Sequence, residues 1–245
     1  MFRKSLVFIA LLGLLAACGA SVNQSIDIAD GNTVDGDLTN VNGAIRVGSG
    51  SEVKGRINNV NGLIQLGNDS SARAINNVNG AIRLGEGVRA ASIESVNGSL
   101  DLGNGVHVSG NASAVNGRIR GNNQVRIDGG LSTVNGGIEL GKGSEVAGKL
   151  SSVNGSIVLE GARASRLETT SGNVQLLNGS EIEGELRVLQ PGRSDTRVPR
   201  IVIGEGSRVG GPLIFQRTVE LFVHDSAEIG TIEGAEAVPF SGNAP

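Results

Sequence analysis

A three-residue unit, Val-Asn-Gly, recurs seven times along this 245-residue chain at nearly constant spacing. Each unit begins 18 or 19 residues after the previous one, and the first residues are Val41, Val60, Val78, Val96, Val115, Val134 and Val153. A period close to 20 residues, filled with Gly, Asn and alternating aliphatics, is typical of solenoids, in which each repeat contacts only its neighbours. The repeat therefore predicts an elongated stack of short turns and argues against a globular fold around one central core.

Residues 41–59 illustrate how one repeat forms a turn of the coil. Ile45 and Val47 alternate with outward residues, as expected of a strand with one buried face. A Gly-Ser-Gly corner follows, and Val53 and Ile57 then point inward from a second strand, with Gly55 between them. We expect three short strands and three corners in each turn, which gives the turn a triangular outline.

The same inward positions hold aliphatic residues along the array. The Ile45 position is occupied by Ile26, Ile64, Ile82, Leu100, Ile119, Ile138, Ile157 and Val174. The Val47 position is occupied by Ile28, Leu66, Leu84, Leu102, Leu140, Leu159 and Leu176, with one break at Gly121. The Ile57 position is occupied by Leu38, Ile75, Ile93, Ala112, Leu131, Leu150, Leu167 and Leu186. Like residues are thus expected to stack on like residues along the axis.

These patterns predict an all-β, single-domain triangular β-solenoid (a parallel β-helix) of about eleven rungs of 17–20 residues. A right-handed coil is favoured over a left-handed one. The regular array is expected over residues 22–189, and residues 190–200, which contain two prolines, are expected to form a protruding loop. Degenerate rungs and a C-terminal cap, in which Phe215, Phe222 and Phe240 gather, are expected over residues 201–245.

Asparagine is expected to form a ladder at one corner of the coil. Asn tolerates the tight backbone of a corner, and stacked Asn amides can hydrogen-bond to one another along the axis. The predicted members are Asn23, Asn42, Asn61, Asn79, Asn97, Asn116, Asn135 and Asn154. We interpret this ladder as structural; the alternative is an outward array that binds a periodic ligand such as ice or glycan.

Composition argues against several classes of function. The formal net charge of −3 does not suit nucleic acid, which needs a basic surface. The chain has no Trp or Tyr to form glycan platforms. The outward column Asp27, Arg46, Gln65, Arg83, Asp101, Arg120 and Glu139 mixes signs, as expected of a solvated face with weak pairing between turns. We therefore expect no cofactor, no metal and no small-molecule substrate.

The two histidines, His107 and His224, are the main candidates for catalysis. We expect both to lie on the surface, and no Ser stands in a Gly-x-Ser-x-Gly elbow. One alternative remains an enzyme: segments such as residues 140–146 resemble the hexapeptide repeat of left-handed acyltransferases, which need a catalytic His. The favoured expectation is that the chain is not an enzyme.

Residues 1–17 have the organisation of a secretory signal peptide. Arg3 and Lys4 are followed by an apolar run that is too short to cross the roughly 30 Å of a bilayer core. The segment Leu-Ala-Ala-Cys that ends at Cys18, the only cysteine, resembles a bacterial lipobox. This resemblance implies cleavage before Cys18, lipidation of Cys18 and a short linker over residues 18–21. Gly19 after the cysteine implies a place in the cell envelope, at the outer membrane.

The rungs also resemble those of bactofilins, which are polymer-forming β-helical proteins. The resemblance is carried by the pattern G-x-V-x-G-x-I, as in residues 50–57 and 143–150, and it extends over nearly the whole chain after Cys18. It implies a non-enzymatic scaffold that interacts with itself or with an envelope protein. Bactofilins are mostly cytoplasmic, so the expected membrane anchor through Cys18 comes from the lipobox resemblance alone. The alternative binding function is that of an adhesin-like module that uses the loop at residues 190–200.

Overall fold

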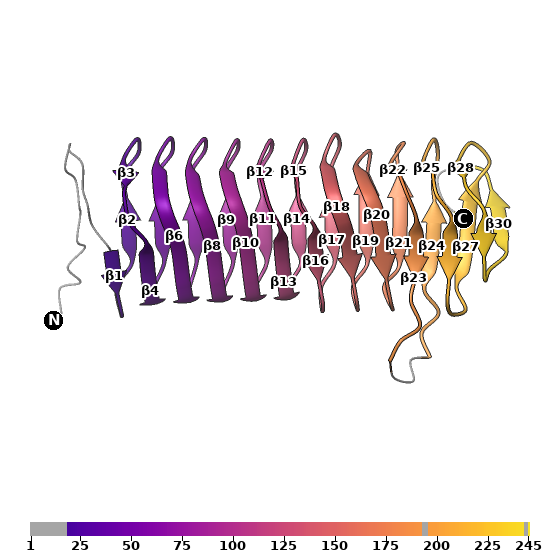
Figure 1. The fold of residues 1–245 in the computed structure, drawn as a ribbon, viewed down its shortest axis with the longest axis horizontal. Coiled ribbons are helices and arrows are strands. Elements are labelled where there is room, and N and C mark those ends of the chain that lie inside the picture. Colours follow the sequence, from indigo (N-terminus) through magenta and orange to yellow (C-terminus); the bar gives the residue numbers. More distant parts are fainter. Residues whose placement is uncertain (1–18, 193–195, 243–244) are drawn as a thin grey trace.

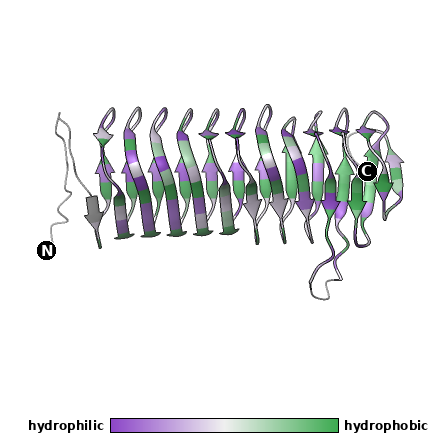
Figure 2. Cartoon of the chain, viewed as in Figure 1, coloured by the Kyte–Doolittle hydropathy of each residue, from purple (hydrophilic) through white to green (hydrophobic). Residues whose placement is uncertain are grey.

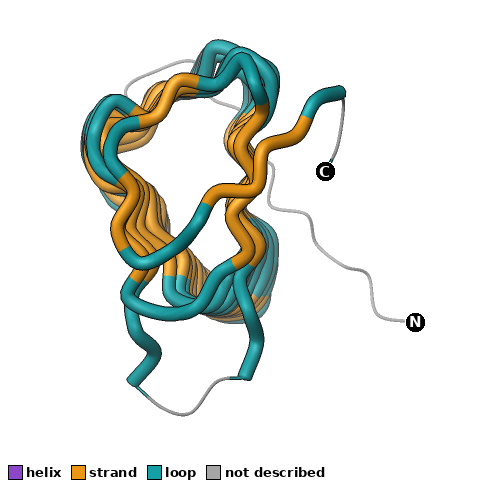
Figure 3. Tube along the Cα trace, turned by 90° about the vertical axis from the view of Figure 1, so that its right-hand side faces the viewer, coloured by secondary structure: helices purple, strands orange, loops and turns teal. Residues whose placement is uncertain are grey.

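The chain coils into a rod of stacked parallel strands (Figure 1). The computed structural model describes residues 19–192, 196–242 and 245. These residues form a β-solenoid of about 11 turns and contain no helix, which confirms the fold class expected from the repeat. Seen end-on, the turns superimpose on one another (Figure 3).

Each turn contributes one short strand to a twelve-stranded parallel sheet, which we call the first side of the coil. Its strands, in spatial order, are β2 (Ile26–Ile28), β5 (Ile45–Val47), β7 (Ile64–Leu66), β9 (Ile82–Leu84), β11 (Leu100–Leu102), β14 (Ile119–Gly121), β17 (Ile138–Leu140), β19 (Ile157–Glu160), β21 (Val174–Leu177), β24 (Arg200–Ile203), β27 (Glu220–His224) and β30 (Ala237–Phe240).

The rest of each turn belongs to an eighteen-stranded parallel sheet. Its strands are β1 (Gly19–Ser21), β3 (Thr33–Val34), β4 (Leu38–Asn42), β6 (Glu52–Asn61), β8 (Ser71–Asn79), β10 (Arg89–Asn97), β12 (His107–Val108), β13 (Ala112–Asn116), β15 (Arg126–Ile127), β16 (Leu131–Thr133), β18 (Glu145–Ser152), β20 (Arg163–Thr169), β22 (Glu181–Ile182), β23 (Leu186–Val188), β25 (Arg208–Val209), β26 (Leu213–Phe215), β28 (Glu228–Ile229) and β29 (Ile232–Glu233).

This second sheet supplies the other two sides of the turn. The second side is the short segment aligned with Thr33–Val34, and the third side is the longer segment aligned with Leu38–Asn42. In some turns the two segments are separate strands, and in β6, β8, β10, β18 and β20 they run together. The pairings β6–β8 and β18–β20 shift in register between the two segments. Three strand segments per turn therefore produce the triangular coil expected from the sequence.

The core is a narrow column of aliphatic side chains along the axis. Ile45, Val47, Val53 and Ile57 are all buried, and their equivalents pair in register from turn to turn. Hydrophobic and hydrophilic residues alternate in the same way in successive turns, as Figure 2 shows. The expected stacking of aliphatic residues at equivalent positions of successive turns is therefore confirmed.

The break at Gly121 has a local cause. Gly121 lies between Leu102 and Leu140 in the core column, and a Cβ atom at this position would approach Leu140 Cδ2 to 2.7 Å. The leucine of the next turn therefore occupies the space that a side chain at residue 121 would need.

Each end of the rod carries one further strand. Residues Gly19–Ser21, which belong to the short linker expected over residues 18–21, form strand β1, paired with β4. At the other end, β30 adds one strand to the first side beyond the last expected rung. Pro239 in β30 suits an edge strand because it has no N–H to donate. Phe215 is a buried core residue and takes no part in the expected C-terminal cap.

The segment expected to form a loop leaves the rod between β23 and β24 (Figure 1). Because of it, residues paired between β22 and β25 are 27 positions apart, as Glu181 and Arg208 are. The Arg217 guanidinium donates hydrogen bonds to the carbonyl oxygens of Thr170 and Arg197, and thus ties the base of the loop to the rod.

Candidate functional site

The eight asparagines singled out by the repeat lie in one exposed column at the corner that follows the third side. Seven hydrogen bonds of 2.8–3.0 Å join the eight residues, and in each bond Nδ2 donates to Oδ1 of the asparagine in the preceding turn. The six inner amides each use one N–H and one oxygen lone pair in this chain of bonds. Their other N–H and lone pair remain available to water or to a partner.

The valine that precedes each of these asparagines points outward, although sequence reasoning did not recognise it as an exposed column. Its exposed fraction is 37–41% in the seven repeats. With Val22, these valines make up eight of the ten large exposed hydrophobic residues found in the described part of the chain. Exposed apolar side chains usually occur singly, and a contiguous row of them is typical of a contact surface.

The outward column two residues before the valines is nearly neutral. It consists of Thr39, Asn58, Asn76, Glu94, Ser113, Ser132 and Ser151, aligned by strand register. A groove of about 360 Å³ is lined by residues of both columns, from Thr39 to Val115. We call the seven repeat valines and these seven residues together the valine face.

Beneath the valine face lies a buried polar column that sequence reasoning missed. Asn40, Asn59 and Asn77 point inward, and their Nδ2 atoms donate to the carbonyl oxygens of Gln24, Gly43 and Gly62. Ser95, Thr133, Ser152 and Thr169 occupy the same position in later turns. The sequence does contain the pattern that predicts this inward orientation, because each of these residues follows an inward aliphatic by two positions and side chains alternate in direction along a strand.

Three oxygens of this column are buried without a hydrogen-bond donor. The Oδ1 atoms of Asn40, Asn59 and Asn77 accept no bond from the described residues. A buried acceptor without a donor costs free energy, so these three asparagines stabilise their turns less than the Ser or Thr residues of the later turns do.

The second side carries a column of alternating charge. Arg126, Glu145, Arg163, Glu181, Arg208 and Glu228 follow one another in register. Ion pairs join Arg126 to Glu145, Glu181 to both Arg163 and Arg208, and Arg208 to Glu228. All of these side chains except Glu181 are exposed, so each pair contributes little to stability.

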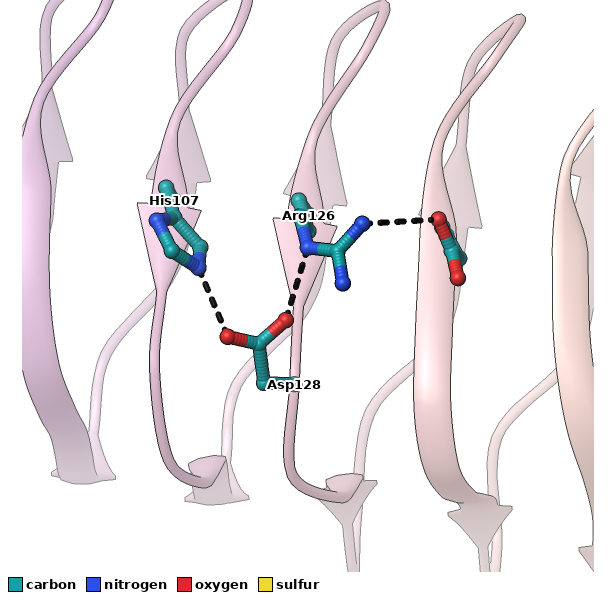
Figure 4. A network of polar contacts seen from close by, with 4 residues as sticks. His107, Arg126 and Asp128 are labelled. Atoms are coloured by element: carbon teal, nitrogen blue, oxygen red, sulfur yellow. Dashed lines mark hydrogen bonds and ion pairs between the residues drawn. The ribbon is translucent and has the colours of Figure 1, made fainter.

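His107 lies between Arg89 and Arg126 in the same column, and its environment is that of a polar network (Figure 4). Its Nε2 atom lies 2.8 Å from Oδ2 of Asp128, whose Oδ1 accepts a hydrogen bond from Arg126 at 2.7 Å. The hydrogen bond from His107, followed by the one from Arg126, holds the pKa of the Asp128 carboxyl below its usual value. His224 lies on another side, six turns along the rod, where its Nδ1 atom is 2.8 Å from Ser226 Oγ.

The first side behaves as a solvated charged face. Arg46 pairs with Asp27 at 3.2 Å and Arg120 with Glu139 at 2.9 Å, in each case between adjacent turns. On the second side, the ion pair with Asp35 raises the pKa of Lys54. Charges on these two sides are therefore matched largely within the chain.

In residues 19–192 and 196–242, no group of three or more His, Cys, Asp or Glu side chains is placed to hold a metal ion. In the same part of the chain no helix is long and apolar enough to span a bilayer. Cys18, the expected lipidation site, lies outside the described residues.

Comparisons of this chain with protein-family models, with characterised proteins and with solved structures find no match.

Proposed function

We propose that this chain is a non-enzymatic, envelope-anchored β-solenoid that acts as a rigid scaffold and interaction surface. The observation that carries this proposal is the unbroken stacking of about 11 turns, which at ~4.8 Å per turn makes a rod roughly 50 Å long. Its sides are flat sheets joined by short corners, which suits contact with extended partners better than enclosure of a small substrate.

The lipobox-like segment before Cys18 supports an anchor at the N-terminal end of the rod. Strand β1 begins at Gly19, directly after Cys18. A lipid on Cys18 would hold the first turn at the bilayer surface without a spacer, and the rod would extend from there into the envelope. The bactofilin-like pattern of the rungs supports the scaffold role.

Lipid labelling and cell fractionation test the anchor. The parent chain is expected to incorporate a labelled fatty acid and to sediment with membranes, and Cys18→Ala is expected to lose both properties. A Cys18→Ala chain that still incorporates lipid would contradict the anchor. Retention of the parent chain in the soluble fraction would contradict the location.

A second candidate function is that of an adhesin-like module, favoured by the loop between β23 and β24 that projects from the rod (Figure 1). Deletion of residues 190–197 leaves seven positions from Leu186 to Ile201, as from Leu131 to Ile138 in a regular turn. This deletion is expected to abolish capture of a partner in this case, without lowering the melting temperature of the rod. The weaker enzymatic alternative predicts turnover that depends on His107 or His224. Full acyl-transfer activity in a His107→Ala/His224→Ala chain would exclude that role for both residues.

A further inference from the structure

We infer that the valine face is the surface through which two copies of this chain pair side by side. The inference deepens the proposed scaffold role by naming a second copy as the partner, and it does not depend on the anchor at Cys18. It starts from a contrast between the sides: eight of the ten large exposed hydrophobic residues of the described chain stand in one row, on one side.

The shape of this face complements a second copy of itself. The valines recur once per turn, at the ~4.8 Å spacing of hydrogen-bonded strands, and a row with this period matches an identical row. Beside the row runs the groove that residues of both columns line. A two-fold arrangement places the valine ridge of each copy in the groove of the other, as an isologous interface requires.

Charge favours the same partner. The chain has a formal net charge of −3, so two copies repel each other weakly at long range. Among the fourteen residues of the valine face only Glu94 is charged, whereas the first and second sides carry the ion pairs described above. Two copies can therefore meet at this face with few buried charges, and depletion of charge is typical of interface cores.

The size of the face is sufficient for a reversible dimer. Seven turns at ~4.8 Å and a five-residue strand give a patch of about 34 by 17 Å, so a pair of copies would bury roughly 1,100 Å² in total. This is just above the ~1,000 Å² expected of a biological interface. The exposed asparagine ladder borders the valines and supplies free amide groups for a polar rim.

The order of the valines provides a cross-linking test. Val96 is the fourth of the seven, so it lies close to its own counterpart in either an antiparallel or a parallel in-register pair. Oxidation of the purified full chain carrying Val96→Cys is expected to give a covalent dimer. The parent chain, with Cys18 alone, gives the background, and Arg83→Cys on the first side is the matched control because Arg83 is also well exposed.

Charge insertion tests whether the valines hold the pair together. Val78→Glu/Val115→Glu, introduced with Val96→Cys, is expected to abolish the covalent dimer and to give the monomer mass in sedimentation. Gln65→Glu/Gln175→Glu adds the same charge on the first side and is expected to leave the dimer intact. Unchanged circular dichroism would show that both double variants are folded.

Several results would overturn the inference. These are a parent chain that remains monomeric at all concentrations, equal cross-linking at residues 83 and 96, and a dimer that survives the two glutamates. A monomeric parent that binds isolated cell-wall polysaccharide, and loses this binding in the glutamate variant, would overturn it in favour of a glycan ligand. Loss of lipid labelling at Cys18 would count against the anchor alone.

Discussion

At the scale of single residues, each core position has a stringent requirement because it lies between buried positions of the turns before and after it. Leu102 is 2% exposed and lies between Leu84 and Gly121 in the first side. Leu102→Asp would bury a carboxylate without a partner, and we expect loss of the cooperative urea transition. Asp101→Ala, on the outward face next to it, is the control and is expected to cost less than about 1 kcal/mol. A normal urea transition for Leu102→Asp would contradict the inward placement.

Corner glycines differ in why they are needed. A Cβ atom at Gly98 would overlap the carbonyl oxygen of Gly80 in the preceding turn, whereas a Cβ at Gly105 would meet nothing within 4 Å. Gly105 has φ +65°, so alanine there costs only the strain of a left-handed residue, about 1–2 kcal/mol. We expect Gly98→Ala to lower the free energy of unfolding by more than Gly105→Ala. Equal losses in urea melts would show that the turns are spaced more widely at this corner.

At one buried asparagine we expect a substitution that does not lower the free energy of unfolding. Thr133 donates to the carbonyl oxygen of Gly117, as Asn59 does to Gly43, but leaves no amide oxygen without a donor. Asn59→Thr should therefore maintain or raise the free energy of unfolding, because a buried unpaired acceptor costs about 1–3 kcal/mol. Asn61→Thr breaks the exposed ladder and is expected to destabilise the chain by about 1 kcal/mol. Destabilisation of both variants by the same amount would contradict this distinction.

At the scale of strands, polar contacts between turns set local titration behaviour. The folded-state pKa of Asp128 is lowered, first by the hydrogen bond with His107. A carboxyl whose pKa falls on folding stabilises the fold above its unfolded pKa of about 3.9, and this contribution is lost as the pH falls through the folded value. We expect His107→Ala and Arg126→Ala each to raise the Asp128 pKa, as measured by carboxyl-carbon NMR. An unchanged Asp128 pKa in both variants would contradict the network.

Much of this element-scale arrangement follows from the repeat itself. Ile45, Ile57 and their equivalents were predictable because a period of two inside a period near 19 fixes which side chains share a column. The orientation of the polar residues, inward or outward, was harder to predict. Asn59 and Asn61 carry the same side chain at alternating positions, yet one is buried and the other is exposed.

The exposed valines show a second limit of sequence reasoning. Val60 follows an inward residue in a run of good strand formers, and its type alone does not distinguish an exposed β-branched residue from a core residue. The charge column from Arg126 to Glu228 was present in the sequence, but its cross-turn pairs depend on a spacing that increases from 18 to 27 residues at the loop. Cys18 remains a prediction from its lipobox-like context.

At the scale of the whole molecule, the three sides of the rod have different chemistry. Charges on the first and second sides are paired between turns, whereas the third side presents a neutral row of valines beside an amide ladder. This asymmetry gives a rod with repeating turns a preferred side for contact. It is also the basis of the proposed pairing of two copies.

Distances between spin labels along one outward column test the central claim most directly. With one label at residue 27 and a second at residue 101, 139 or 175, in a chain without Cys18, the labels are four, six or eight turns apart in the first side. The stacked coil predicts mean distances of ~19, ~29 and ~38 Å, rising linearly by ~4.8 Å per turn. Distances that do not increase in proportion to the number of turns would contradict the solenoid and every proposal built on it.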